Sequence, residues 1–351
     1  MIWYRIWLGL SAFLITGTWL PFSDSDWWFV RAFDFPRMQL LILVVLAFIW
    51  GIWKFDAGAL RHALLVLLGA SALFLVSRIA PYTPLYPKEL KAATDDAAER
   101  RLRLYSVNVL QDNRDYGATL AQIREQDPDV AVLLETDAAW IAAVRELRER
   151  YPYYREVPLP NYYGLAVYSR LPWRRPRVYE LVDDSIPSLY ATLELPSRDS
   201  VNLYVIHPTP PSPTENPKST ERDAELLMVA DSVRQQTAPS IVLGDLNDVA
   251  WSPSSRLFKR TSGLLDPRVG RGTFNTFATG NWLLRWPLDY IFPSNEFTVH
   301  RLQRLPDVGS DHFPIVADLQ YQPEMRPEQE KSRPRGDDLQ EAAEEKAKVG
   351  K

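Results

Sequence analysis

The sequence predicts an α/β fold in which two sheets pack together with helices outside them, preceded by three transmembrane helices. Three observations lead to this prediction. Apolar residues concentrate in three long segments near the N-terminus. A central region then alternates strand-like and helix-like segments, and the strands are the more numerous. Two of its apolar strand-like runs end in clusters of carboxylate, amide and imidazole side chains, the usual place for the chemistry of an α/β enzyme.

The N-terminal region, residues 1–80, is predicted to be a membrane anchor. Its apolar segments are Ile2–Leu20, Met38–Trp53 and Ala63–Val76, the last extended by apolar residues of 59–79. Each reaches or approaches the roughly 17 to 25 residues that cross a bilayer as a helix. Tryptophan and tyrosine cluster near their ends, as interfacial residues do. A cleavable signal peptide is the alternative for the first segment, but its start is barely basic and two more apolar segments follow closely.

The distribution of basic residues bears on the orientation of this anchor. A literal count near the helices places fewer lysines and arginines on the N-terminal side, which would put the N-terminus outside. However, Lys54 and Arg61 lie in a very short turn between two helices, where the positive-inside rule is strongest, whereas acidic residues dilute Arg31 and Arg37. We therefore predict a multi-pass cell-membrane protein with a cytoplasmic N-terminus and an extracytoplasmic catalytic domain.

Two polar segments flank the central region. Residues 81–101 form a linker in which Pro81, Pro84 and Pro87 give a stiff exit from the membrane, and Lys88–Arg100 is predicted to be a short helix. Residues 321–351 are highly charged and have almost no aliphatic content from Pro323 onward. We expect this tail to be disordered or loosely helical and dispensable for chemistry.

The central region, residues 102–320, is predicted to be one catalytic domain. Its expected strands and helices follow from periods of two and of 3.6 residues. A proline-rich segment, His207–Pro213, cannot form regular structure and is expected to be a rigid loop beside the site. The expected strands are Leu102–Val109, Val130–Leu134, Leu165–Tyr168, Tyr190–Leu195, Val201–Ile206, Ile241–Leu243, Leu288–Phe292 and Phe313–Leu319; the expected helices are Tyr116–Gln126, Ala138–Arg150 and Ser219–Gln235.

Two motifs carry the chemistry, Ile-Val-Leu-Gly-Asp-Leu-Asn-Asp at 241–248 and Gly-Ser-Asp-His-Phe-Pro at 309–314. Asp245 and Asn247 alternate along what is predicted to be an extended strand end, so both side chains would project to one face. There a carboxylate can orient a water molecule and an amide can donate to a phosphate oxygen. Asp311 and His312 add a carboxylate suited to a metal ion and an imidazole that can exchange protons. Together these residues indicate hydrolysis of a phosphate ester.

The remaining motifs make a family resemblance specific. They are Tyr-Ser-Val-Asn ending at Asn108, Val-Ala-Val-Leu-Leu-Glu ending at Glu135, Gly-Leu-Ala-Val-Tyr-Ser-Arg ending at Arg170, Val-Ile-His ending at His207, and Leu-Asp-Tyr-Ile-Phe around Asp289. In this order they resemble the endonuclease/exonuclease/phosphatase superfamily, over a span from about residue 102 to residue 319. The resemblance implies a four-layer α/β/β/α sandwich. Its three-helix membrane members tend to have a basic second turn and an extracytoplasmic catalytic domain.

The resemblance also implies a role for each site residue. Three residues, Glu135, Asp311 and Asn108, would hold or surround a divalent cation. Asp245 would orient and deprotonate the attacking water, and Asn247 and His207 would donate to the non-bridging phosphate oxygens. His312, held by Asp289, would present a positively polarised imidazole. Arg170 is assigned to substrate binding. Apart from the resemblance, Asn275 in the segment Thr273-Phe-Asn275 is a further candidate for substrate binding, with core or loop packing as the alternative.

The expected cation is Mg²⁺ or Mn²⁺. The chain has no cysteine and only four histidines, so a nitrogen and sulfur cage for zinc is not expected. An oxygen-rich ligand set suits a hard cation that keeps several water molecules.

The sequence leaves the substrate open. The whole chain has a formal net charge of −4 at pH 7, and the central region has no dense basic stripe apart from Arg174, Arg175 and Arg177. A nonspecific duplex-DNA binder needs a face that neutralises phosphates, so the nuclease alternative is weakened. A lipid head group, a cell-envelope phosphodiester and nucleic acid all stay open as substrates, and no obligate protein partner is evident. The alternative from another class is an inactive membrane scaffold; the complete set of site residues argues against it.

Overall fold

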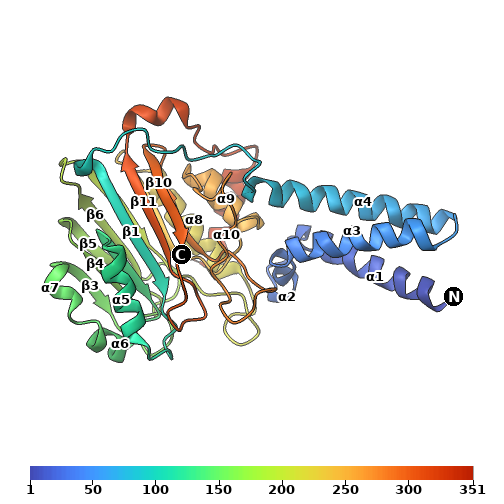
Figure 1. Ribbon diagram of the computed structural model, residues 1–351, viewed down its shortest axis with the longest axis horizontal. Helices are drawn as coiled ribbons and strands as arrows, with labels where there is room; N and C mark the ends of the chain where they lie inside the picture. Colours follow the sequence, from blue (N-terminus) through green and yellow to red (C-terminus); the bar gives the residue numbers. More distant parts are fainter. Residues whose placement is uncertain (351) are drawn as a thin grey trace.

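Residues 1–350 are described by a computed structural model, in which a helical bundle projects from one end of a two-sheet sandwich (Figure 1). The bundle consists of α1 (Ile2–Trp19), α3 (Arg37–Lys54) and α4 (Ala59–Ile79), with a short α2 (Trp28–Arg31) in the connection between α1 and α3. Short 3-10 turns follow α1, α2 and α4 at 20–22, 32–34 and 80–82.

The bundle carries apolar side chains on its outside. Leu73 and Val66 are 75% and 71% exposed, although a small interior core forms around Trp7 and Leu68. Two helices are long and apolar enough to cross a membrane, α3 and α4 with its following turn. The expectation of three such helices is therefore met only in part. The helix α1 has a comparable length but is not one of these two.

The sandwich contains eleven strands in two sheets. The six-stranded sheet has the order β10-β11-β1-β2-β4-β3, and the five-stranded sheet has the order β5-β6-β7-β8-β9. The strands of the first sheet are β1 (Arg101–Asn108), β2 (Val130–Leu134), β3 (Tyr153–Val157), β4 (Leu165–Ser169), β10 (Phe297–Arg304) and β11 (Ile315–Tyr321); those of the second are β5 (Trp173–Tyr179), β6 (Ser188–Glu194), β7 (Ser200–Val205), β8 (Ser240–Asp245) and β9 (Asp289–Pro293).

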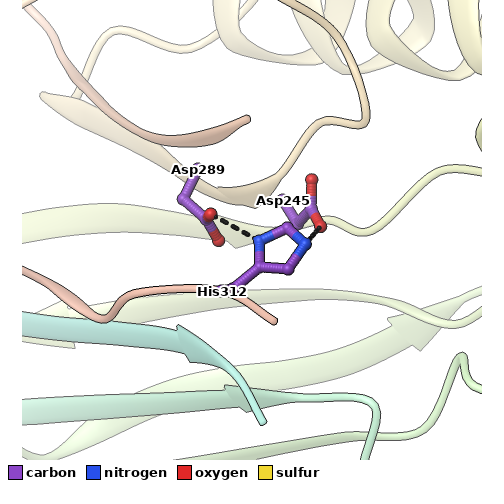
Figure 2. Close-up of side chains that lie close together, drawn as sticks. All are labelled: Asp245, Asp289 and His312. Atoms are coloured by element: carbon purple, nitrogen blue, oxygen red, sulfur yellow. Dashed lines mark hydrogen bonds and ion pairs between the residues drawn. The ribbon is translucent and has the colours of Figure 1, made fainter. Parts of the chain in front are cut away.

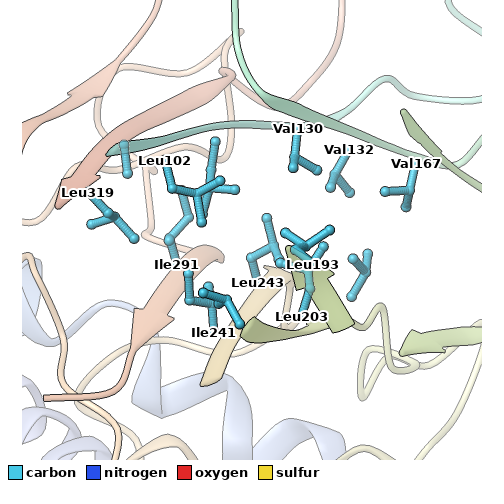
Figure 3. Close-up of a cluster of buried hydrophobic side chains, with 14 of the residues drawn as sticks. Leu102, Val130, Val132, Val167, Leu193, Leu203, Ile241, Leu243, Ile291 and Leu319 are labelled. Carbon is cyan, nitrogen blue, oxygen red and sulfur yellow. The ribbon is translucent and has the colours of Figure 1, made fainter. Parts of the chain in front are cut away.

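The two sheets bury a shared apolar layer between them (Figure 3). Val130 and Val132 of one sheet face Leu203 and Leu243 of the other across this layer. Helices α5 (Tyr116–Gln126), α6 (Ala138–Ala143) and α7 (Leu147–Arg150) lie against the outer face of the six-stranded sheet, and α8 (Thr220–Arg234) and α9 (Pro253–Ser262) against that of the five-stranded sheet. The layers therefore follow the order helix, sheet, sheet, helix, as predicted.

Three strands of the structure were not predicted, β3, β5 and β10. The helix α9 of the catalytic region was also not predicted. Both β3 and β5 are edge strands with mostly exposed side chains, so they lack an apolar period of two. In addition, β5 contains Pro176 within an irregular stretch of its pairing with β6, a position that only an edge strand tolerates. The predicted helix at 138–150 is divided into α6 and α7.

Of the two flanking segments, the linker differs from expectation, and the tail has one of its two expected forms. The linker Lys88–Arg100 is not a helix, apart from a short 3-10 turn at Ala98–Arg100. Its backbone instead pairs with the edge strand β10, because Val299 donates to the Lys91 carbonyl and accepts from the Ala93 amide. In the tail, α10 (Asp338–Ala347) is a helix, one of the two forms expected, and it packs against the rest of the chain. Its Ala342 contacts α8 and α9, and Asp338 pairs with Arg260.

Candidate active site

The strand ends of the five-stranded sheet place two carboxylates side by side. Asp245 at the end of β8 is directly opposite Asp289 at the start of β9. The residue before Asp245 is a glycine for a steric reason: a Cβ on Gly244 would lie 2.0 Å from the Ile206 carbonyl oxygen. This close approach of two backbones brings His207, which follows β7, next to Asp245.

The six-stranded sheet contributes the facing half of the site. Its parallel strands β1 and β2 end at the same edge, so Asn108 and Glu135 lie together. The Asn108 amide nitrogen donates to Glu135 Oε1 at 2.6 Å and to Asp245 Oδ2 at 3.2 Å. Asn108 thus connects the acidic groups of the two sheets.

His312 lies between the two carboxylates of the five-stranded sheet, as Figure 2 shows. Its Nδ1 is 2.8 Å from Asp289 Oδ2, and its Nε2 is 3.5 Å from Asp245 Oδ2. The ring of Phe277 packs against the imidazole with a centroid distance of 4.9 Å. The short contact fixes the proton on Nδ1 toward Asp289 and directs Nε2 toward Asp245.

The two histidines beside Asp245 have opposite electrostatic environments. Burial disfavours the charged form of His312, but the carboxylates of Asp289 and Asp245 outweigh it and raise the pKa of His312 to about 10. Burial dominates at His207, lowers its pKa to about 4 and leaves it neutral, despite the attraction of Asp245. At neutral pH the site therefore contains one imidazolium and one neutral imidazole.

Burial raises the pKa values of the carboxylates, whereas it acts to lower those of the histidines. Burial raises the pKa of Glu135 to about 7, with Asp311 adding repulsion and the Asn108 hydrogen bond working against the shift. Burial likewise raises the pKa of Asp245, although the charges of His312 and His207 partly offset it. A bound cation would relieve this cost at Glu135, because it favours the ionised carboxylate.

The residues present fit a hard divalent cation on the side of Glu135. The Glu135 carboxylate supplies oxygens there, and Asp311 is close enough to raise the pKa values of both Glu135 and His312. The Asn108 amide nitrogen donates to Glu135, and its oxygen accepts from the Leu110 amide. Asp245, Asp289 and His312 also form a compact cluster of potential ligands. An imidazolium cannot bind a metal, so the raised pKa of His312 disfavours a cation in that cluster.

Three predicted site residues have a different geometry from the one expected. The chain is not extended at Asn247, whose φ is 49°, and its amide donates to the Pro208 carbonyl oxygen at 2.9 Å. Arg170 lies away from the site and pairs with Asp127, because β4 runs antiparallel to β2 and its Arg170 end is opposite to the Glu135 end. The side-chain oxygen of Asn275 is buried without a hydrogen-bond partner among the described residues, and its backbone carbonyl accepts from Arg304.

Other residues that support the site were not predicted. The Gln111 backbone amide donates to Glu135 Oε2 at 3.3 Å, and the ring of Tyr163 packs against His207 at 5.3 Å. The Thr276 hydroxyl accepts from the Asp289 amide at 3.2 Å, next to Phe277. Of the residues next to Thr276, only Asn275 was predicted to take part in the site, because the contacts of Gln111, Tyr163 and Thr276 join residues far apart along the chain.

The sequence matches one family model. Residues 105–312 match the Endonuclease/Exonuclease/phosphatase family, a span that includes Asn108, Glu135, His207, Asp245 and His312. A search of curated proteins returns no match.

Solved structures with the same fold include bacterial and animal proteins. An endonuclease/exonuclease/phosphatase from Beutenbergia cavernae has 23% identity and a TM-score of 0.50, over 64% of this chain and 72% of that one. The human Nocturnin catalytic domain has 18% identity and a TM-score of 0.51, over 63% and 95%. Danio rerio TDP2 in complex with a single-strand DNA product has 17% identity and a TM-score of 0.51, over 64% and 100%. At these identities the likeness establishes the fold.

Proposed function

Because the chain belongs to the endonuclease/exonuclease/phosphatase family of phosphoester hydrolases, we propose that it is a membrane-anchored phosphoesterase that uses Mg²⁺ or Mn²⁺ and attack by water. The observation that carries the proposal is the position of His312 between Asp289 and Asp245, with Asn108 linking Asp245 to Glu135. This arrangement places a base, a cationic donor and a cation-binding carboxylate around one point.

Asp245 is the general base of this proposal. Its Oδ1 accepts the Asn247 backbone amide at 2.9 Å, which fixes the orientation of the carboxylate. Its other oxygen, Oδ2, faces the centre of the site, where it can orient a water molecule and take its proton. Burial strengthens it as a base by raising its pKa.

The donors around Asp245 stabilise the charge that develops on the phosphate. The imidazolium of His312 directs its Nε2–H into the site, and Asp289 holds the ring in place. Neutral His207 supplies a further N–H donor, and Asn247 has a second amide hydrogen beyond the one given to Pro208. Glu135, Asn108 and Asp311 would hold the divalent cation, which when bound neutralises charge on the phosphoryl group and on the leaving oxygen.

The anchor sets the location of this activity. The apolar exterior of α3 and α4 supports insertion in a membrane, with the sandwich at one surface. We propose that this surface is extracytoplasmic. An alkaline phosphatase fusion after Lys91 tests the orientation, because this enzyme is active only when it is exported. An inactive fusion at this point, together with a fluorescent cytoplasmic reporter at the same point, would show that the sandwich lies on the cytoplasmic side.

Substrate assays of the full-length protein in detergent test the chemistry. The protein is incubated with Mg²⁺ or Mn²⁺ and separately with an aryl phosphodiester, phospholipid, plasmid DNA and RNA, with chelated metal as the control. We expect metal-dependent release of the aryl alcohol. A nuclease would cleave only the nucleic acids, and an inactive scaffold would neither turn over a substrate nor bind the metal.

A further inference from the structure

One loop connects the active site to the anchor. The loop at 277–286 begins at Phe277, whose ring contacts His312 at a centroid distance of 4.9 Å and Trp286 at 6.2 Å. Trp286 in turn contacts Phe35 edge-on at 5.5 Å. Phe35 precedes α3 by two residues. Three successive ring contacts therefore lead from the catalytic imidazole to the start of a helix that can span a membrane.

The tip of this loop is apolar and exposed. Trp282, Leu283 and Leu284 are 77%, 55% and 43% exposed. The Leu283 carbonyl oxygen accepts from the side-chain amide of Gln39 at 2.5 Å, in the first turn of α3. The tip thus lies beside the end of the bundle that is nearest to the sandwich (Figure 1). Exposed tryptophan and leucine beside a membrane helix match the composition of a bilayer interface.

A second loop flanking the site rests on the same end of the anchor. The segment after His207 pairs with the connection between α1 and α3: Trp28 donates its amide to the Pro217 carbonyl, and Ser219 donates to the Asp26 carbonyl, both at 2.8 Å. In this connection Trp27 and Phe29 are about half exposed, at 47% and 48%. Both loops beside the site are therefore held against the anchor.

Two arginine side chains stack on Phe313, the residue that follows His312. The guanidinium groups of Arg285 and Arg304 lie over the ring of Phe313, at 4.9 Å and 4.3 Å from its centroid. Within residues 1–350 neither arginine has an ion pair, although both donate to backbone carbonyls. Two cations without carboxylate partners next to a phosphoesterase centre suit an anionic phosphate.

We propose that the substrate is the phosphate ester of a lipid in the anchor's own membrane, with the head group entering between the two loops and Trp282–Leu284 inserted in the interface. This inference rests on the proposed function and narrows its substrate class. It follows from the continuity of the exposed apolar tip with the anchor, which places the site at the membrane surface. A nucleic acid would need a broad basic face, and the chain is acidic overall.

The experiment compares one lipid with one soluble substrate, using the full chain in phospholipid nanodiscs. The test variant is W282S/L283S/L284S, and the matched control is Y153S/Y179S, which removes exposed aromatic residues from the edge strands β3 and β5. We expect the test variant to hydrolyse nanodisc phospholipid more slowly by on the order of tenfold, because it loses apolar contact with the bilayer. Turnover of a soluble aryl phosphodiester should not change, and the control should match the wild type on both substrates.

The outcomes separate this inference from the proposed function. An equal loss on both substrates, or no loss on the lipid, overturns the membrane role of the loop. Turnover of the aryl ester by the wild type without turnover of phospholipid overturns the inference alone. No turnover of either substrate overturns the proposed function and the inference together.

A second readout does not depend on catalysis. The chain has no cysteine, so Leu283→Cys provides a single attachment point for an environment-sensitive fluorophore. In nanodiscs, lipids with a spin label near the head group should quench the fluorophore at 283 and not one attached at Tyr153→Cys. Equal quenching at the two positions would overturn insertion of the loop.

Discussion

The two halves of the active site occupy equivalent positions in their sheets but have different chemistry. In the six-stranded sheet, parallel strands end at Asn108 and Glu135, where a carboxylate receives hydrogen bonds from an amide side chain and a backbone amide. In the five-stranded sheet, β8 and β9 present Asp245 and Asp289 on either side of a charged imidazole. The first half suits a cation, and the second suits proton transfer. Asn108 is the direct contact between them.

The largest expected effect comes from the cation-binding half. Glu135→Gln keeps the size and shape of the side chain but removes its anionic charge, so it should abolish divalent-dependent turnover and leave the fold intact. A Mg²⁺ titration of activity, with the thermal unfolding curve as the check on folding, measures this. Glu225→Gln is the matched control, because burial also raises the pKa of Glu225 to about 7 at a place outside the site. Full activity of the Glu135 variant with Mg²⁺ would show that the cation does not bind in this half of the site.

The second effect comes from the base in the other half. Asp245→Asn keeps the shape of the side chain and cannot take a proton from water, so the turnover number should fall by about two to four powers of ten. Metal affinity should change much less, since Asp245 is not assigned to the cation. Mn²⁺ binding followed by its paramagnetic signal measures the affinity separately from the rate. Loss of Mn²⁺ binding in this variant would mean that the two halves share the cation.

The sequence predicted the ends of strands better than the direction in which residues face. Asp245, Asp289 and His312 meet as expected because each lies at or just before an apolar strand whose place in the sheet is clear from its composition. Arg170 was misplaced because strand composition does not reveal that β4 runs antiparallel to β2. The extended backbone expected at Asn247 was wrong: its conformation is left-handed, and it makes hydrogen bonds with Arg222 and Pro208, which are remote in sequence.

The flanking segments teach the same lesson about long-range contacts. The linker is polar and proline-punctuated, yet Lys91 and Ala93 pair with Val299 on an open sheet edge. The charged tail has few apolar residues, but Ala342 packs against α8 and α9, and Asp338 pairs with Arg260. Both outcomes depend on surfaces formed by other parts of the chain, which local composition cannot predict.

The third prediction concerns the pH dependence of the proton-transfer half. The carboxylates raise the pKa of His312 to about 10, so the rate should fall on the alkaline side as the imidazolium loses its proton. Asp289→Asn removes the negative charge closest to Nδ1, lowers the pKa of His312 and should move this alkaline limb to lower pH. His312→Ala should remove the limb and most of the rate. Rate profiles of the three proteins measure this; an unmoved limb in the Asp289 variant would show that these residues are not coupled.

The smallest effect should be on stability alone, at a buried carboxyl outside both halves. Glu225 on α8 is 3% exposed and accepts a hydrogen bond from the Ser188 hydroxyl at 2.6 Å. Burial raises its pKa from 4.5 to about 7, so between these pH values the folded protein binds a proton that the unfolded chain has released. The free energy of unfolding should therefore decrease as the pH rises from 4.5 to 7, and this loss should be complete above pH 7.

Glu225→Gln removes that loss, because a neutral amide can still accept the hydrogen bond from Ser188. The variant should match the wild type near pH 4 and be more stable at pH 8 by up to roughly 3 kcal/mol, the free energy that corresponds to the shift. Denaturant unfolding of the full chain in detergent at the two pH values measures the difference. If the variant were less stable at pH 8, the Glu225 carboxylate would be ionised and paired in the folded protein.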